Sequence, residues 1–210
     1  FYHIYEVDVD GRNLRQLTAG PYDDLMPTYL PDGKIVFCST RRRGYARCFG
    51  PQFSRRWDVY TLHRVDADGS NLRALSQHDT NEWFPSVDHS GRILYARWDY
   101  IDRENGLGSK FWTCSPDGRD PRALHGNYPH PYSVQPEYIG SKQGTRPLGA
   151  CSEVHFRAIP NSHRYIFTGV PHHGASFGPL ALLDLRLPDE GTMNQVTRIT
   201  ADQRFPESQT

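Results

Sequence analysis

Short runs whose pattern of apolar and polar residues is typical of strands recur along the chain, and a turn-forming group bounds each of them. The stretch Phe1–Asp8 alternates before Asp10-Gly11, and the mostly apolar run Lys34–Ser39 follows Pro31-Asp32-Gly33. A period of two predicts β-strands, and Asp-Gly between two such runs predicts a tight turn. No helical periodicity of useful length is found. The pattern therefore predicts an all-β chain of short antiparallel strands.

One unit of this pattern occurs three times. Asp8–Thr18, Asp66–Ser76 and a weaker copy at Pro116–Leu124 each carry a Gly followed by Arg four residues later and by Leu six residues later. The first two copies are 58 residues apart. A repeat of this size is typical of the four-stranded blade of a β-propeller.

The repeat predicts a single partial β-propeller domain over residues 1–210, built from four-stranded antiparallel blades with strands A to D. The chain begins in strand C of one blade and runs through three more, about three and a half blades in all. The blade fragments are 1–18, 27–76, 85–124 and 136–200, and residues 206–210 start the next blade. Because an open half-ring exposes sheet edges, we expect the rest of the ring outside this segment or in another chain.

The third unit departs from the other two. Pro136-Glu137-Tyr138 stands where Pro27 and Pro85 stand, and Gly140–Gly149 is then inserted before the predicted inner strand Val154–Ala158. The B strands are predicted to fill the core, because neighbouring blades cover both of their faces. Both members of three apolar pairs should therefore be buried: Val36-Phe37, Ile93-Leu94 and Ile166-Phe167.

Strand direction sorts the connections onto two faces. The D-to-A and B-to-C connections share one end of the blades, here called the mouth face, and the A-to-B and C-to-D turns share the far face. All the long connections fall on the mouth face: 19–26, 40–57, 77–84, 98–109, 125–135 and 170–178. Long loops on a rigid scaffold commonly carry binding residues, so we expect any site there.

Charged and aromatic residues from separate blades meet on the mouth face in this arrangement. The candidate partner- or ligand-binding residues are Asp23, Asp24, Arg43, Asn81, Glu82, Trp83, Trp98, Asp99, His172 and His173. Substitution of Glu82 or His172 is expected to weaken binding with little loss of stability, whereas Asp10 and Asp68 on the far face should be dispensable for binding. Packing and capping are the alternative roles for such residues. The arginine-rich loop 40–57 either binds an anion or an acidic partner or is a solvated loop without a ligand.

Catalytic and metal motifs are weak. The Asp-x-Asp-Gly-x-Asn stretches at 8–13 and 66–71 lack the downstream Glu of a calcium loop, which favours structural turns. Gly174–Gly178 fits Gly-x-Ser-x-Gly without the strand before it and the helix after it that a nucleophile elbow needs. His172 and His173 are weak metal candidates, because adjacent side chains point apart; hydrogen-bonded loop histidines are the default. No catalytic residue is predicted.

The cysteines leave the redox compartment open. Cys38 and Cys48 bracket the start of the arginine-rich loop and could form a disulfide, but Cys38 ends a core strand, so a buried free thiol is an equal alternative. No Cys-x-x-Cys or Cys-x-x-Cys-His occurs, which argues against a tight zinc site or a c-type haem attachment in this segment.

Composition narrows the function classes. The 24 acidic and 24 basic residues balance, so nothing global indicates nucleic-acid binding or an anionic membrane. No apolar run approaches the roughly 18 residues of a membrane span, and we expect no membrane insertion. Phe1 already has the pattern of a residue in the middle of a strand, and the chain is interpreted as a piece of a longer protein.

The unit Asp8–Thr18, Pro27 and Pro31–Arg41 resembles the TolB-type, WD40-like propeller repeat. That resemblance implies a six-bladed ring in a bacterial extracytoplasmic (periplasmic or similar) protein. Asp23–Arg41, Asn81–Val87 and the His172-His173 loop resemble, more closely, the middle propeller domain of hydrazine synthase alpha-subunit-like proteins, which join a propeller to cytochrome c-type domains. Any haem c must then lie elsewhere in the full-length protein, and no cofactor is expected within the segment.

Two functions follow as hypotheses. The first is a binding and scaffold propeller that presents its mouth face to other domains or subunits of the same protein, or to a ligand. The alternative is an enzymatic role in which the same face forms one wall of a haem or metal site in a hydrazine synthase-like multihaem oxidoreductase. The segment holds no self-contained catalytic site, so the sequence does not decide whether the protein is an enzyme.

Overall fold

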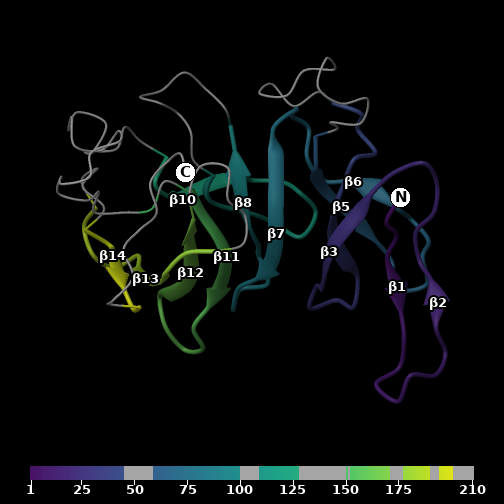
Figure 1. Ribbon diagram of the computed structural model, residues 1–210, viewed down its shortest axis with the longest axis horizontal. Helices are drawn as coiled ribbons and strands as arrows, with labels where there is room; N and C mark the ends of the chain where they lie inside the picture. Colours follow the sequence, from purple (N-terminus) through teal and green to yellow (C-terminus); the bar gives the residue numbers. More distant parts are fainter. Residues whose placement is uncertain are drawn as a thin grey trace.

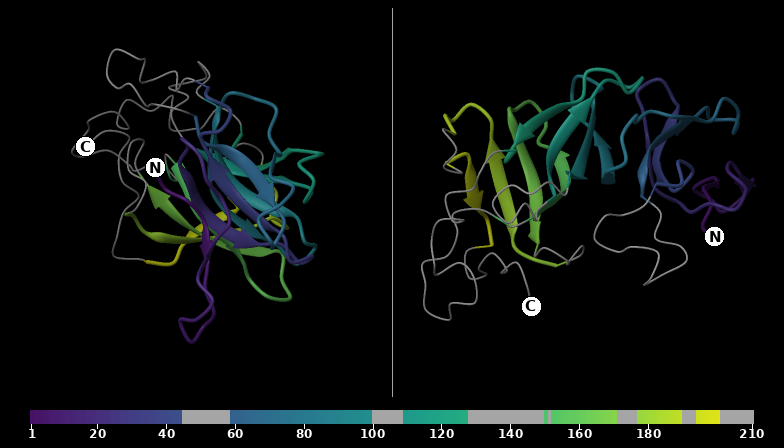
Figure 2. Two further views of the ribbon diagram at one scale, coloured as in Figure 1. Left: turned by 90° about the vertical axis from the view of Figure 1, so that its right-hand side faces the viewer. Right: turned by 90° about the horizontal axis from the view of Figure 1, so that it is seen from above.

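The chain folds into successive four-stranded antiparallel sheets, as the repeat predicts. The computed structural model describes residues 1–44, 59–99, 109–127, 150, 152–170, 177–189 and 194–200, and within these it has strands and no helix. Figures 1 and 2 show the sheets following one another along an arc, each packed face to face against the next. The described residues are therefore an all-β propeller segment.

The chain enters through a two-stranded sheet, the partial blade. It consists of β1 (Tyr5–Glu6) and β2 (Arg15–Gln16), which correspond to strands C and D. Blade 1 has the strand order β3 (Asp24–Tyr29), β4 (Ile35–Ser39), β5 (Thr61–Val65) and β6 (Arg73–Ala74).

Two complete blades follow. Blade 2 contains β7 (Asn81–Val87), β8 (Ile93–Trp98), β9 (Lys110–Cys114) and β10 (Arg122–His125). Blade 3 contains β11 (Ser152–Ala158), β12 (Arg164–Val170), β13 (Leu180–Asp184) and β14 (Val196–Arg198). In each blade, consecutive strands pair as a meander, so the predicted A-to-D order is confirmed.

Each inner strand carries a β-bulge at the same place. The register of strand A against strand B shifts around Met26, Phe84 and His155, and these three residues have φ values of 57°, 56° and 59°. A bulge of this kind bends a strand and increases its local twist. It also fixes the alignment of the blades: Phe156 follows the third bulge where Pro27 and Pro85 follow the first two. The predicted alignment of Pro136 with those prolines is therefore wrong, because register places Phe156 there.

The core lies between blades. Val36 faces blade 2 while Phe37 faces the partial blade, and both are fully buried. Ile93 and Leu94 likewise point to opposite faces of blade 2. Phe167 is fully buried, but Ile166 is only half-buried because, within the described residues, no blade covers the second face of blade 3. The predicted burial is thus confirmed for five of the six residues and wrong for Ile166.

Candidate functional site

The structure describes the mouth-face connections 17–23 and 75–80 in full, and of the longer connections it describes the ends, such as 40–44 and 126–127. Eight of the ten candidate binding residues lie within the described residues. Residues 45–58, 100–108, 128–149 and 171–176 lie outside the described residues, and Cys48, His172 and His173 lie among them. The residues that can be placed therefore come mainly from blades 1 and 2.

A repeated pair of hydrogen bonds joins each blade to the one before it, close to the mouth face. Two adjacent residues at the start of each inner strand bind one residue of the preceding blade. The amide of the second residue donates to the carbonyl of the residue in the preceding blade, and the side chain of the first accepts from the amide of that residue. At 2.8–3.1 Å, Asp23 and Asp24 bind Tyr2, Asn81 and Glu82 bind Tyr60, and Ser152 and Glu153 bind Ser109. We call these contacts joints 1, 2 and 3.

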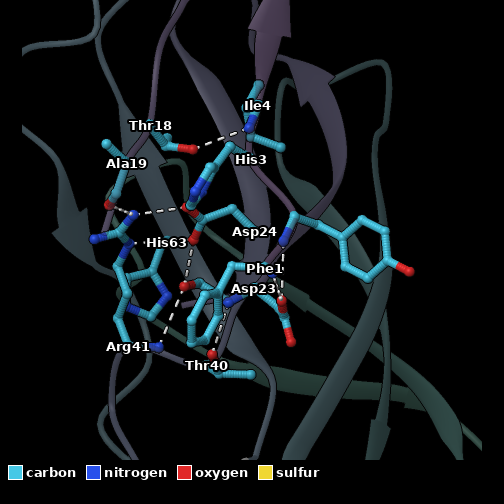
Figure 3. A network of polar contacts seen from close by, with 12 residues as sticks. Phe1, His3, Ile4, Thr18, Ala19, Asp23, Asp24, Thr40, Arg41 and His63 are labelled. Carbon is cyan, nitrogen blue, oxygen red and sulfur yellow. Dashed lines mark hydrogen bonds and ion pairs between the residues drawn. The ribbon is translucent and has the colours of Figure 1, made fainter. Parts of the chain in front are cut away.

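Joint 1 centres on the carboxylate of Asp24, which is 1% exposed (Figure 3). Arg41 donates to it through Nε at 3.1 Å and through Nη2 at 2.6 Å, and Ser39 donates from Oγ at 2.6 Å. His3 Nδ1 lies 3.8 Å from Asp24 Oδ2. A two-pronged arginine contact of this kind fixes a carboxylate in one orientation.

Joint 2 centres on Glu82, also 1% exposed. Its Oε2 accepts from the Leu62 amide at 2.8 Å and from the Ser76 hydroxyl, and its Oε1 lies 2.8 Å from His78 Nε2. The carboxylate thereby bridges strand C, the end of strand D and the connection that enters the inner strand. All three contacts belong to the joint.

Joint 3 centres on Glu153, which is fully buried. Its Oε2 lies 3.0 Å from His125 Nδ1. Burial alone would raise the pKa of Glu153, but the nearby His125 and Lys110 outweigh it, so that the pKa lies below its usual value. The neighbouring positive charges keep this buried carboxylate ionised.

Asp24, Asn81 and Glu82 thus lie in blade-to-blade contacts, where almost none of their surface is open to solvent. The expectation that Glu82 can be replaced with little loss of stability is therefore wrong. Removing a buried carboxylate leaves its buried donors without partners, and that costs stability. The other joint residues, including Ser39, Ser76 and His125, were not predicted. Thr18, Ser76 and His125 align at the ends of the D strands, and this alignment in the sequence could have indicated the joint residues.

Three consecutive arginines on the mouth face have different partners. Arg41 binds Asp24 and the Ala19 carbonyl, and Arg42 binds Asp79 and the Ser76 carbonyl. These two side chains tie the loops on either side of blade 1. The side chain of the third, Arg43, donates from Nη2 to the Tyr22 hydroxyl at 3.4 Å and contacts neither a carboxylate nor a carbonyl among the described residues.

The Arg43 side chain is exposed and lies over the ring of Tyr22, 5.4 Å from its centroid. Its backbone is held in a left-handed turn, with φ of 55° and an amide that donates to the Thr40 carbonyl at 2.9 Å. The Arg41 guanidinium also lies over the Tyr22 ring, 4.7 Å from its centroid. Arg43 is therefore a positioned cation on the open part of the mouth face.

The tryptophan candidates lie together on blade 2. The rings of Trp83 and Trp98 stack with centroids 6.1 Å apart, and Trp98 is 8% exposed. Asp99 is engaged by Arg97 Nε at 2.5 Å, and the Arg97 guanidinium lies 4.3 Å from the centre of the Trp112 ring. The structure brings Trp83, Trp98 and Asp99 into one region, where contacts with each other and with neighbouring side chains cover much of their surface.

Cys38 is a free thiol, fully buried in the core between blades 1 and 2. Burial raises the pKa of this thiol well above its usual value. Of the two alternatives for Cys38, the structure has the free thiol. The described residues contain no group of three or more His, Cys, Asp or Glu side chains placed to hold a metal ion. In the same part of the chain, no helix is long and apolar enough to cross a membrane.

Comparisons with known proteins agree with the fold. No family model matches the chain. An uncharacterized protein of Agrobacterium fabrum is 24% identical over 126 residues, which is 59% of this chain and 38% of that protein. The chain therefore spans well under half the length of this relative.

Solved structures resemble the chain more completely. Hydrazine synthase from Kuenenia stuttgartiensis matches 95% of this chain with a TM-score of 0.70 at 16% identity, over 30% of its own length. An oligogalacturonate lyase in complex with manganese matches 93% of this chain with a TM-score of 0.54 at 16% identity, over 42% of its length. TolB from Agrobacterium tumefaciens is 25% identical over 59% of this chain and 40% of its own, with a TM-score of 0.46. The chain therefore has a β-propeller fold that resembles the corresponding part of hydrazine synthase.

Proposed function

We propose that this chain is a binding and scaffold propeller domain of a larger bacterial extracytoplasmic protein, and that its mouth face receives a neighbouring domain or subunit. The observation that carries the proposal is Arg43. It is held in one backbone conformation, braced on Tyr22 and exposed, and it has no carboxylate partner among the described residues. A positioned guanidinium suits a carboxylate on a partner surface, and Arg is enriched in protein interfaces.

The far face offers a contrast within the same molecule. Its exposed arginines at the C-to-D turns each have an aspartate two residues away: Arg12 with Asp10 at 2.8 Å, and Arg119 with Asp117 at 3.2 Å. These cations are already neutralised locally. The difference supports a partner on the mouth face, where topology also gathers the long connections.

Arginine-selective dicarbonyl labelling of the native full-length protein, read by peptide mass spectrometry, tests the proposal. Arg43 should react several times more slowly than Arg12 and Arg119, because a partner covers it. In the denatured protein, the three should react alike. Equal native reactivity at all three positions would rule out a partner at Arg43.

A second candidate is one wall of a haem or metal site, for which the likeness in fold to hydrazine synthase is the supporting observation. Its residues in this chain would be His172 and His173, which lie outside the described residues. Metal and haem analysis of the full-length protein and of a His172→Ala variant separates the two functions. Stoichiometric metal that the variant loses would favour this candidate, and metal content unchanged by the substitution would count against it.

A further inference from the structure

Three matching hairpins join strand C to strand D on the far face, and each has Asp-Gly at its tip. They span, in the partial blade, blade 1 and blade 2, residues 7–14, 65–72 and 114–121. The amides of Gly11, Gly69 and Gly118 each donate to the carbonyl three residues earlier, at 2.8–2.9 Å. Their φ values are 82°, 88° and 88°. The three tips therefore have the same local conformation.

The tips of blades 1 and 2 are anchored on the preceding blade by a hydrogen bond that the first tip lacks. Arg15 Nη2 donates to the Ala67 carbonyl at 2.6 Å, and Arg64 Nη1 donates to the Pro116 carbonyl at 3.0 Å. The equivalent residue of the first hairpin is Val9. It is fully exposed, and its carbonyl has no hydrogen-bond donor among the described residues.

Packing of the glycines makes the same distinction. A Cβ added at Gly69 would lie 3.0 Å from the Leu17 carbonyl oxygen, and one added at Gly118 would lie 2.4 Å from the Leu75 carbonyl oxygen. No atom lies within 4 Å of a Cβ added at Gly11. Figures 1 and 2 show the loop between β1 and β2 extending away from the sheets. The first tip can therefore open without breaking a contact to another blade.

The fourth Asp-Gly pair, Asp32-Gly33, lies in the A-to-B turn of blade 1 and is held in other ways. A Cβ added at Gly91 of blade 2 would lie 3.4 Å from Pro31 Cγ, so the two turns are in contact. Lys34 Nζ donates to Asp32 Oδ2 at 2.6 Å, and this contact lowers the pKa of the Asp32 carboxyl. The tip of the first hairpin is therefore the least constrained Asp-Gly turn among the described residues.

We propose that Asp10-Gly11 is a site of spontaneous isoaspartate formation, and that the other three Asp-Gly turns are protected from this reaction. The Gly11 nitrogen attacks Cγ of the neutral Asp10 carboxyl, and a bond forms between them. The carboxyl hydroxyl leaves as water with the amide hydrogen, which gives a cyclic imide. Water then opens the imide. Cleavage between the nitrogen and Cγ restores aspartate, whereas cleavage between the nitrogen and the Asp10 main-chain carbonyl carbon gives isoaspartate.

Ring closure requires the turn to open first. In the closed turn, the Gly11 amide donates to the Asp8 carbonyl, and Arg12 donates to the Asp10 carboxylate. The rate therefore follows the population of the locally open hairpin, which is largest where the tip has the fewest contacts. Glycine after aspartate favours the attack because it has no Cβ. The product carries an extra methylene in the main chain of the hairpin, whatever binds at the mouth face.

Timed incubation of the native full-length protein at mildly acidic pH tests the proposal. Peptides are then mapped by electron-transfer mass spectrometry and with an endoproteinase that cleaves before aspartate and not before isoaspartate. Asp10 should convert about tenfold faster than Asp68 and Asp117, because one or two hydrogen bonds change an opening equilibrium by about that factor. In the denatured protein, the three rates should become similar. Peptide mapping also separates Asp10 from Asn105-Gly106, which lies outside the described residues.

Equal native rates at the three positions would overturn the proposal. So would the absence of isoaspartate at Asp10 in the native protein when it forms there in the denatured protein. Asp10→Glu keeps the charge, but its longer side chain closes a six-membered ring far more slowly. The isoaspartate signal at this position should therefore disappear in that variant.

Asparagine variants separate the packing of a turn from the ionisation of its carboxyl. Hydrogen bonds from Ser70 lower the pKa of the Asp68 carboxyl, which by itself slows the reaction there because the neutral carboxyl is the reactive form. Asparagine closes the same ring with loss of ammonia and has no carboxyl to ionise. Native Asp10→Asn should therefore deamidate about tenfold faster than native Asp68→Asn, as measured by the gain in mass. Equal deamidation rates in the two variants would show that packing does not protect the second turn.

Discussion

At the scale of the residue, three acidic side chains show how position along a strand decides between binding and structure. Asp24, Glu82 and Glu153 each stand at or next to the start of an inner strand, close to the mouth face. The carboxylates of Glu82 and Glu153 contact the preceding blade, whereas that of Asp24 binds Arg41 of its own blade and lies 3.8 Å from His3 of the partial blade. All three residues are at most 1% exposed. Charged groups that are buried to this degree must be paired or hydrogen-bonded, and each of the three is. Their acidity therefore serves the stacking of blades.

Asp24→Asn should destabilise the protein by about 3–5 kcal/mol, because it removes the charge that pairs with a mostly buried Arg41. Asp10→Asn is the matched control, since Asp10 and Arg12 are exposed on the far face, and it should cost no more than about 0.5 kcal/mol. Urea titration of both variants measures the difference. Equal, small losses would mean that joint 1 contributes little.

At the scale of the element, the C-to-D turns have a second role beyond reversing the chain. A Cβ added at Gly118 would lie 2.4 Å from the Leu75 carbonyl oxygen, and one added at Gly69 would lie 3.0 Å from the Leu17 carbonyl oxygen. In blades 1 and 2, the turn thus sits directly against the residue that follows strand D of the blade before it. Gly11, in the partial blade, has no atom within 4 Å of such a Cβ.

Gly118→Ala and Gly11→Ala separate backbone strain from this close approach. The two glycines have similar φ values of 88° and 82°, so both substitutions should incur the left-handed penalty of about 1–2 kcal/mol. Gly118→Ala should cost about a further 1–3 kcal/mol, because the turn must move off Leu75. Thermal unfolding that shows the same loss for both would contradict the packing of turn on strand.

At the scale of the whole molecule, stability comes from apolar layers shared by successive blades. The layer between blades 2 and 3 includes Phe111 and Phe156, whose rings stack with centroids 3.8 Å apart, and Phe167 beside them. The opposite edge of the segment differs: β1 pairs with β2 on one side and has no partner strand on the other among the described residues. Tyr2 and Tyr5 there are more than half exposed.

Truncation of Phe37 or Phe167 to Ala should each cost about 3–5 kcal/mol, because both side chains are fully buried in these layers. Leu14→Ala, at an exposed position, should change stability by no more than about 0.5 kcal/mol. Denaturant titrations that give under 1 kcal/mol for both phenylalanines would contradict the assigned register.

The sequence by itself determined the fold class, the blade order and the two faces. Those properties follow from local signals: the apolar run within Lys34–Ser39, the Asp-Gly turns and the repeated unit act over a few residues or recur along the chain. Only the tertiary structure decided which polar residues of the mouth are buried. The burial of Glu82 depends on Leu62 and Ser76 in the preceding blade, and the third alignment depends on a bulge at His155. The packing of each blade against the one before it sets these features, and no local hydrophobic pattern encodes them.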